Sequence, residues 1–356
     1  MKRADLLLLS CVSFLTFFGL FMIYDASSFS AFRDFGNQYH YVKDQFIWII
    51  LGFIALIFGF FFDYRKYYSL ALPLLIVSIV FLILVFIPGI GTSALGAKRW
   101  INLGFIILQP SELIKLSLAV YLAAWFSNKE KGRLPAFLLL LGLITGLIMI
   151  QPDMGTASIV LAEAIVVYFL SGASLLHFLG IIPASFIAGL ILIKLEPYRM
   201  ARLATFLNPD QSLETSSYHT RQILIALGSG GLTGLGFGNS LQKYAYLPES
   251  TTDSIFAIIA EETGFIGALF IILIFAVIVW RGFNIAMKAK DTFGKLLAGA
   301  IITFIATQSL INLAAQTLLV PLTGVPLPFL SYGGSALIVN LFSVGILLNI
   351  SKYGKQ

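Results

Sequence analysis

The sequence predicts an all-α polytopic membrane protein with about ten transmembrane helices and both termini on the inner side. The first observation behind this fold class is composition. Of the 356 residues, 58% are hydrophobic and only 11% are charged, whereas soluble domains average roughly 45–50% apolar and about 25% charged residues. The second is a series of long apolar runs, and the third is the distribution of lysine and arginine between the loops.

Each apolar run is long enough to span roughly 30 Å of hydrocarbon. The predicted helices cover residues 5–24, 45–62, 69–87, 111–127, 136–151, 154–171, 175–195, 254–280, 294–319 and 333–350. The fifth and sixth are short and meet at the sequence QPDMG, residues 151–155. We treat residues 1–356 as a single membrane domain, in which residues 196–253 form one long outer loop between the seventh and eighth helices.

The loop charges predict the orientation, because short inner loops are rich in lysine and arginine. With the N-terminus inside, the inner segments hold thirteen such residues: Lys2, Arg3, Arg65, Lys66, Lys129, Lys131, Arg133, Arg281, Lys288, Lys290, Lys295, Lys352 and Lys355. The short outer loops hold only Arg33, Lys43, Lys98 and Arg99. The net charge of +6 therefore reflects topology and does not indicate nucleic-acid binding.

The sequence also disfavours cysteine-based sites and a cleaved signal peptide. Cys11 is the only cysteine, so neither an intramolecular disulfide nor a thiolate metal site is expected. The run from Leu6 to Tyr24 is longer than a signal-peptide core, so we expect it to remain as the first membrane helix.

The outer loop contains a short amphipathic helix, SYHTRQILIALGSGG, followed by a glycine-rich stretch over residues 228–238. Two interpretations stay open for the glycines. They form either a compact loop lying on the membrane or a cradle for a bulky polar headgroup, because glycine permits close approach of the backbone.

Ionisable residues inside the predicted helices are the main functional signal, since they usually face a cavity or a partner. In LQPSELIKL, Pro110 begins a helix, and Glu112 and Lys115 share one face three residues apart. This pair is either an internal ion pair at a helix start or the charged wall of a cavity. Lys98 and Arg99, just upstream, are either surface charges or ligands for phosphate.

Four further polar features carry the same ambiguity. Asp153 is a candidate N-cap of the sixth helix, and Glu163 lies mid-span, where a polar partner is expected. Gln308, Asn312 and Gln316 form a polar stripe of the kind that joins helices. The proline- and glycine-rich segment 320–334 cannot form a regular helix, so it should lie within protein or beside a water-filled cavity.

Acidic residues lie at the start of the eighth helix and deeper within it. The sequence STTD fits a capping box with Ser250 as N-cap and Asp253 at the third helical position. Capping does not explain Glu261, which is eight residues further on, or Glu262 beside it. We expect Glu261 to line a cavity open to the outside, paired with Lys115 or with the polar stripe, and Glu262 to pack against a neighbouring polar group.

Together these segments resemble the SEDS (shape, elongation, division, sporulation) family, which includes RodA, FtsW and SpoVE. The resemblance is carried in order by GAKRWINLG…QPSELIKL, QPDMGTA, LGSGGLTGLGFGNSLQKYAYLPESTTDSIFAIIAEETG and PLTGVPLPFLSYGGSA. The variant NSLQKYAYLPE looks more like the FtsW branch than the RodA branch. The chain departs from the family pattern at Thr251 and Ser254, which flank Asp253, and at Asp25, where small residues are usual.

The resemblance implies an inverting glycosyltransferase that polymerises lipid II on the outer face of the bacterial cytoplasmic membrane. It implies that Asp253, which matches the family's essential aspartate, is the catalytic base, and that a class B penicillin-binding protein is the partner transpeptidase. The candidate substrate-binding residues are Lys98, Arg99, Glu112, Lys115, Asp153, Arg221, Gln222, Glu261, Gln308, Asn312 and Ser331.

Lys98, Arg99, Lys115 and Arg221 are the candidates for holding the leaving pyrophosphate, because negative charge develops on its oxygens. A divalent cation, Mg²⁺ or Mn²⁺, is a further candidate for that work, although no ligand spacing indicates a metal site. Two alternatives from other classes remain: a lipid II flippase, since embedded acids and broken helices also suit a transporter, and a non-catalytic scaffold of the division machinery.

Overall fold

The computed structural model describes residues 4–94, 97–102, 104, 107–128, 132–207, 215–244 and 246–354. Five of the thirteen inner cations, namely Lys2, Arg3, Lys129, Lys131 and Lys355, lie outside the described residues. Within the described part, each of the ten predicted apolar segments is helical over most of its length. The predicted all-α architecture is thereby confirmed in its main elements.

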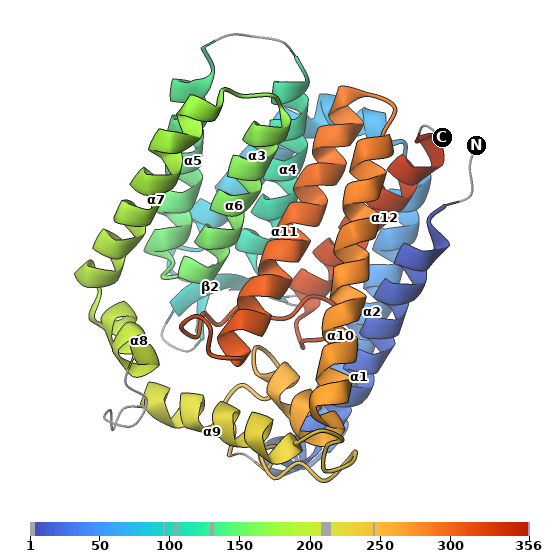
Figure 1. The fold of residues 1–356 in the computed structure, drawn as a ribbon, viewed down its shortest axis with the longest axis vertical. Coiled ribbons are helices and arrows are strands. Elements are labelled where there is room, and N and C mark those ends of the chain that lie inside the picture. Colours follow the sequence, from blue (N-terminus) through green and yellow to red (C-terminus); the bar gives the residue numbers. More distant parts are fainter. Residues whose placement is uncertain are drawn as a thin grey trace.

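The first half of the chain forms α1 (Leu6–Phe35), α2 (His40–Phe61), the 3₁₀ turn η1 (Tyr64–Lys66), α3 (Tyr67–Leu84), α4 (Pro110–Ser127), α5 (Leu134–Ile150) and α6 (Met154–Leu170). The second half forms α7 (Leu175–Leu195), α8 (Pro197–Leu207), α9 (Thr215–Gly230), α10 (Ile255–Lys288), α11 (Thr292–Gln316) and α12 (Gly334–Tyr353). Both termini lie at one end, which we call the terminal end, and α8 and α9 cross the opposite end, which we call the loop end (Figure 1).

Seven of the described helices are long and apolar enough to cross a membrane: α1, α2, α3 with η1, α7, α10, α11 and α12. The helices α5 and α6 are apolar but shorter, as their meeting at QPDMG predicted. The chain is therefore a multi-pass membrane protein. The exact number of spans and the orientation remain predictions.

A small sheet was not expected from the sequence. The strands β1 (Gly91–Ala94), β2 (Ala97–Asn102) and β3 (Ile107–Leu108) form an antiparallel sheet in the order β1-β2-β3. Gly91 pairs with Ile101, and Ile101 also pairs with Leu108. The strands are too short to show a two-residue alternation in the sequence, which is why a loop was predicted there.

The core lies around α4, α11 and α12. Most side chains of these helices are buried, whereas Ile181 is the only buried side chain of α7. Glycines allow the closest contacts: at Gly345 a Cβ would lie 2.2 Å from the carbonyl oxygen of Leu56 on α2. Because small residues let helix backbones approach each other, α2 and α12 pack tightly side by side.

The helix α10 is interrupted at Gly264, which has φ 69° and ψ −169°. Hydrophobicity alone had predicted one continuous helix over 254–280. Instead, the glycine-rich loop enters this break, where the amides of Phe265 and Ile266 donate to the carbonyls of Gly231 and Leu232. The outer loop is thereby attached to the membrane helix.

Candidate functional site

The candidate site lies at the loop end, in the turn that precedes α10. The capping box predicted for residues 250–253 is wrong, because α10 begins at Ile255 with Ser254 as its N-cap. Glu249 has a positive φ of 51°, and its carbonyl accepts hydrogen bonds from the amides of Thr252 (3.2 Å) and Ser254 (3.1 Å). Residues 249–254 therefore form a turn of their own, and Asp253 stands outside the helix.

The polar stripe of α11 fixes the main chain of this turn. Asn312 Nδ2 and Gln316 Nε2 both donate to the carbonyl oxygen of Asp253, at 2.9 and 2.8 Å. Asn312 also donates to the carbonyl of Val325, and Gln308 to that of Pro326. The stripe thus joins α11 to the turn and to the irregular segment after α11, as predicted, and its amide groups do so by donating to main-chain carbonyls.

The segment 317–333 is irregular, as the prolines and glycines predicted. Its Ser331 hydroxyl donates to the carbonyl of Thr252 and accepts from the amide of Leu327. The amide of Tyr332 donates to the carbonyl of Thr251 at 2.8 Å. The main-chain carbonyls of three successive residues, Thr251, Thr252 and Asp253, therefore accept hydrogen bonds from other elements.

The carboxyl group of Asp253 is half-buried and accepts from Thr252 Oγ1 at 3.1 Å. Burial and, to a smaller extent, the nearby Glu249 carboxylate raise the pKa of Asp253 to about 6, while the positive charge of Arg202 opposes the rise. A carboxyl group with a pKa near the working pH suits proton transfer. At neutral pH most of it is ionised and able to accept a proton.

A second polar group lies deeper, between α4 and α11. Lys115 Nζ is 3.0 Å and 2.8 Å from the two carboxylate oxygens of Glu112 and donates to Gln308 Oε1 at 2.6 Å. Lys115 and Glu112 are 0% and 2% exposed, so the predicted ion pair is confirmed and is closed to solvent. Since Gln308 and Asn312 are one helical turn apart, α11 connects this pair to the turn of Asp253.

Glu163 on α6 is fully buried, and neither of its oxygens has a hydrogen-bond partner within the described part of the chain. A polar partner had been expected. A protonated carboxyl group would reduce the energy that such burial costs.

The residues predicted upstream lie in a separate group. Asp153 is buried and caps α6 by accepting from the amide and hydroxyl of Thr156, at 3.0 and 2.9 Å, so the capping interpretation is confirmed. Arg99 Nε donates to the carbonyl of Gln151 at 3.1 Å, and its Nη2 donates to that of Pro152. Lys98 is exposed on the same strand, β2. The two hydrogen bonds of Arg99 attach β2 to the α5–α6 turn.

The expected pairing of Glu261 with Lys115 or the stripe is wrong. The carboxylate of Glu261 accepts from the Ser240 hydroxyl, from the amide of Leu241 at 3.3 Å and from Ser229 Oγ at 3.4 Å. All three lie on the outer loop or at the end of α9, because that loop crosses α10 at its break. Glu261 therefore holds the loop and does not face the Lys115 pair.

Glu262, the next residue, also holds the glycine-rich loop. Its Oε1 accepts from the amides of Gly238 (3.1 Å) and Ser240 (3.2 Å) and pairs with Lys243 Nζ at 3.2 Å. Lys243 also pairs with Asp25 on α1 at 2.9 Å, which gives a partner to the aspartate that departs from the family pattern. Since these glycine-loop amides bind protein groups, the structure favours the compact loop over a headgroup cradle.

Arg221 and Gln222 lie on α9, where Arg221 is exposed and Gln222 half-buried. Sequence reasoning missed two residues closer to Asp253. Arg202 on α8 donates to the carbonyl of Leu322 at 2.7 Å, and its charge lowers the pKa of both Asp253 and His219. His219 on α9 is hydrogen-bonded to Ser254. Neither belongs to a local motif, so only the folded chain reveals them.

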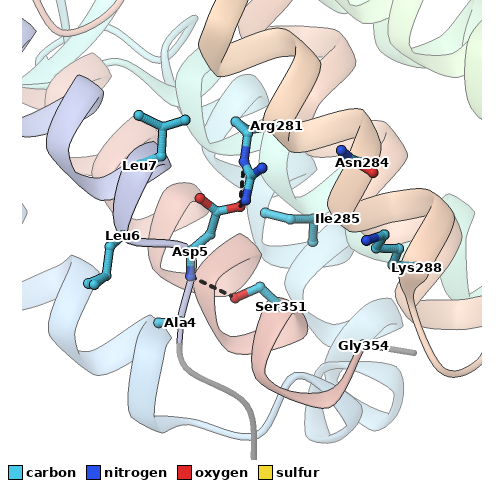
Figure 2. Close-up of a pocket in the computed structure, with 10 residues that line it drawn as sticks. All are labelled: Ala4, Asp5, Leu6, Leu7, Arg281, Asn284, Ile285, Lys288, Ser351 and Gly354. Carbon is cyan, nitrogen blue, oxygen red and sulfur yellow. Dashed lines mark hydrogen bonds and ion pairs between the residues drawn. The ribbon is translucent and has the colours of Figure 1, made fainter. Parts of the chain in front are cut away.

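A cavity of about 290 Å³ lies at the terminal end, between the start of α1 and the ends of α10 and α12. The Asp5–Arg281 ion pair, in which Arg281 Nε and Nη2 both donate to Asp5 Oδ2, occupies one wall. Asn284 and Lys288 lie along α10 beside it (Figure 2). The cavity is at the opposite end of the molecule from Asp253, so it is no part of the candidate site.

Among the described residues, no three His, Cys, Asp or Glu side chains gather as a metal site would require.

This arrangement defines a multi-pass membrane protein with a carboxylate held at an irregular helix mouth, and comparison with known proteins assigns it to a family. Residues 5–356 match the cell cycle protein family of FtsW, RodA and SpoVE, and the chain belongs to this family. It is 41% identical to stage V sporulation protein E of Bacillus subtilis, over 99% of this chain and 98% of that protein. It is 42% identical to the probable peptidoglycan glycosyltransferase FtsW of Trichlorobacter lovleyi, over 98% and 93% of the two chains.

Solved structures agree with this assignment. A chain of a peptidoglycan synthase complex, described as coordinating polymerization and crosslinking, superimposes with a TM-score of 0.81 at 25% identity and covers 99% of this chain and 98% of its own. The rod shape determining protein RodA of Thermus thermophilus superimposes with a TM-score of 0.73 at 26% identity, covering 98% of each chain. The resemblance seen in the sequence is confirmed.

Proposed function

We propose that this protein is a peptidoglycan glycosyltransferase that polymerises lipid II into glycan strands on the outer face of the bacterial cytoplasmic membrane, for cell division or cell shape. The relatives named probable peptidoglycan glycosyltransferase FtsW support the activity. The observation that carries the proposal is Asp253, a half-buried carboxyl group with a pKa of about 6 in a turn held by α11 and the irregular segment.

The proposed reaction is an inverting displacement at a sugar C1. The hydroxyl oxygen of the acceptor sugar forms a bond to C1 of the donor, and the C1–oxygen bond to the polyprenyl pyrophosphate breaks. The pyrophosphate leaves with the bonding electron pair, and the hydroxyl proton passes to the Asp253 carboxylate. A fixed turn suits this step, because a general base must come within ~2.6–3.2 Å of the oxygen that it deprotonates.

Cations at the loop end would hold the leaving pyrophosphate. We assign the leading place to Arg202, whose charge acts on Asp253, with Arg99, Lys98 and Arg221 as further candidates. Lys115 is assigned a supporting function, because its ammonium group is buried between Glu112 and Gln308. Glu112 and Gln308 then act with it to keep α4 and α11 in register with the turn of Asp253.

We also propose that a class B penicillin-binding protein is the partner. The likeness to a chain from a complex that joins polymerization to crosslinking supports such an assembly. Lipid II and membrane lipid complete the set of expected partners, and the active site would face outside.

Purified protein mixed with lipid II in detergent tests the proposal, because detergent micelles have no two sides to transport between. We expect glycan polymer on a denaturing gel. A flippase or a scaffold predicts unchanged lipid II even when the partner transpeptidase is present, and that result would overturn the polymerase assignment.

A further inference from the structure

The chain brings a histidine from the outer loop to the mouth of α10. His219 on α9 and Ser254 are 35 residues apart, yet His219 Nε2 and Ser254 Oγ are 2.7 Å from each other. Ser254 is 0% exposed, so water does not compete for this hydrogen bond. Figure 1 shows α9 crossing the loop end, where α10 begins.

Ser254 does not perform the usual task of a serine at its position. It is the N-cap of α10, and N-cap serines ordinarily accept a hydrogen bond from an amide of the first turn, which stabilises the helix. Here the side chain makes no capping hydrogen bond. Its hydroxyl is bonded to the imidazole instead, so a local helix contact has been exchanged for one between the outer loop and the membrane helix.

The imidazole is neutral in this setting. Burial lowers the pKa of His219 to about 4, and the positive charge of Arg202 contributes in the same direction. A neutral ring keeps one nitrogen as an acceptor and one as a donor throughout the physiological range. His219 is therefore suited to be a constant hydrogen-bond partner and unsuited to exchange protons at neutral pH.

The contact completes the set of anchors around Asp253. Ser331 and Tyr332 hold the two residues before it, and Asn312 and Gln316 hold its own carbonyl. Ser254 follows Asp253 in the chain. Among the side chains of the described residues, only His219 is hydrogen-bonded to Ser254 Oγ. Without His219, the C-terminal side of the turn would lose its link to α9.

We infer that His219 is a positioning residue that acts through Ser254 to orient the Asp253 carboxylate, so that the outer loop takes part in setting the geometry of catalysis. The inference rests on the proposed function, in which Asp253 is the base. A small displacement of a catalytic group can lower the rate by about 100-fold, so even a modest loosening of this turn would be measurable.

The test is lipid II polymerisation by purified His219→Ala, His219→Gln, Ser254→Ala and the double variant His219→Ala/Ser254→Ala. We expect His219→Ala to lower kcat by about 10- to 100-fold with KM for lipid II within a few-fold of the wild-type value. His219→Gln keeps a side-chain amide for the hydroxyl and should restore much of the rate. Ser254→Ala should match His219→Ala, and the double variant should be no worse than either, because both remove one interaction.

His177→Ala is the matched control. His177 Nδ1 is also bonded to a hydroxyl, Tyr168 Oη at 2.7 Å, but it belongs to α7 and lies far from the turn. We expect its activity to stay within twofold of the wild type.

Two results would overturn the inference. One is wild-type kcat for His219→Ala. The other is a loss of activity that follows a fall in thermal stability and is not restored by His219→Gln, which indicates a purely structural contact. Asp253→Asn, assayed in parallel, distinguishes failure of the proposed function from failure of the inference. Full activity of Asp253→Asn rejects the proposed base, whereas an inactive Asp253→Asn beside a fully active His219→Ala rejects only the positioning role.

Discussion

Asp253 acquires its properties from a few neighbours. Burial and the Glu249 carboxylate raise its pKa to about 6, and Arg202 limits the rise. An acid with a raised pKa is ionised only above that value, so its use as a base predicts activity that falls as pH drops through about 6. The same raised pKa means that ionising Asp253 costs more free energy in the folded protein than in the unfolded chain.

The acidic limb of the pH–rate profile should therefore respond to Glu249. Glu249→Gln removes the like charge but keeps an oxygen for the Thr252 hydroxyl, which is 2.8 Å away. We expect kcat/KM to decline at a lower pH in this variant than in the wild type. The measurement is initial polymerisation rate between pH 5 and 8, and an unmoved limb would show that another group titrates.

Arg202 should be more important than other arginines of the same segment. Arg202→Ala should reduce polymerisation by about 100-fold, as expected for loss of a donor to developing charge, and Arg202→Lys should recover only part of it, since lysine lacks the bidentate fork. Arg199→Ala is the control, because Arg199 donates to the carbonyls of Leu192 and Met149. Equal losses of polymerisation activity in Arg202→Ala and Arg199→Ala would indicate that Arg202 has only a structural role.

At the scale of elements, hydropathy predicted where the helices are, because a span must be apolar throughout. The apolar run predicted the start of α10 to within one residue, whereas the STTD pattern placed the N-cap at Ser250 and not at Ser254. Hydropathy did not predict the bend of α10, because the break at Gly264 leaves no mark in an apolar run. The i,i+3 spacing predicted the Glu112–Lys115 pair, whereas Lys243–Asp25 and His219–Ser254 join residues too far apart in sequence for any local pattern.

The break in α10 predicts a sharp difference between two glycines. Gly264 has φ 69°, and a Cβ there would lie 2.3 Å from the Gly234 amide nitrogen. Gly146 on α5 has no atom within 4 Å of that position. Gly264→Ala should destabilise the protein by about 1–3 kcal/mol, and Gly146→Ala should be neutral or stabilising by up to about 1 kcal/mol. Thermal unfolding in detergent measures both; similar melting temperatures would contradict the account of the break.

For the whole molecule, the two ends carry different groups of polar residues. The terminal end holds the Asp5–Arg281 ion pair and the cavity beside it, and the loop end holds Asp253. The position of both termini at one end agrees with the predicted orientation, which rests on inner cations. The sequence could predict that both termini lie on one side, because the rule for orientation uses only the numbers of lysine and arginine in the loops.

Cysteine labelling from outside tests the orientation. In a Cys11→Ala background, a Leu241→Cys probe on the exposed outer loop should react with an impermeant reagent, and a Lys290→Cys probe between α10 and α11 should react only after the membrane is opened. The reverse pattern would put Asp253 on the inner side and remove it from the proposed reaction.

The most direct measurement for the central claim compares wild type with Asp253→Asn in lipid II polymerisation. Asparagine keeps the shape of the side chain and the carbonyl that Asn312 and Gln316 hold, but it cannot accept the hydroxyl proton. Since the native carboxylate is poorly solvated, the variant should fold at least as stably as the wild type and still bind its transpeptidase partner. We predict that this well-folded variant makes no detectable glycan, whereas polymer formed within a few-fold of the wild-type rate would contradict the assignment of Asp253 as the catalytic base.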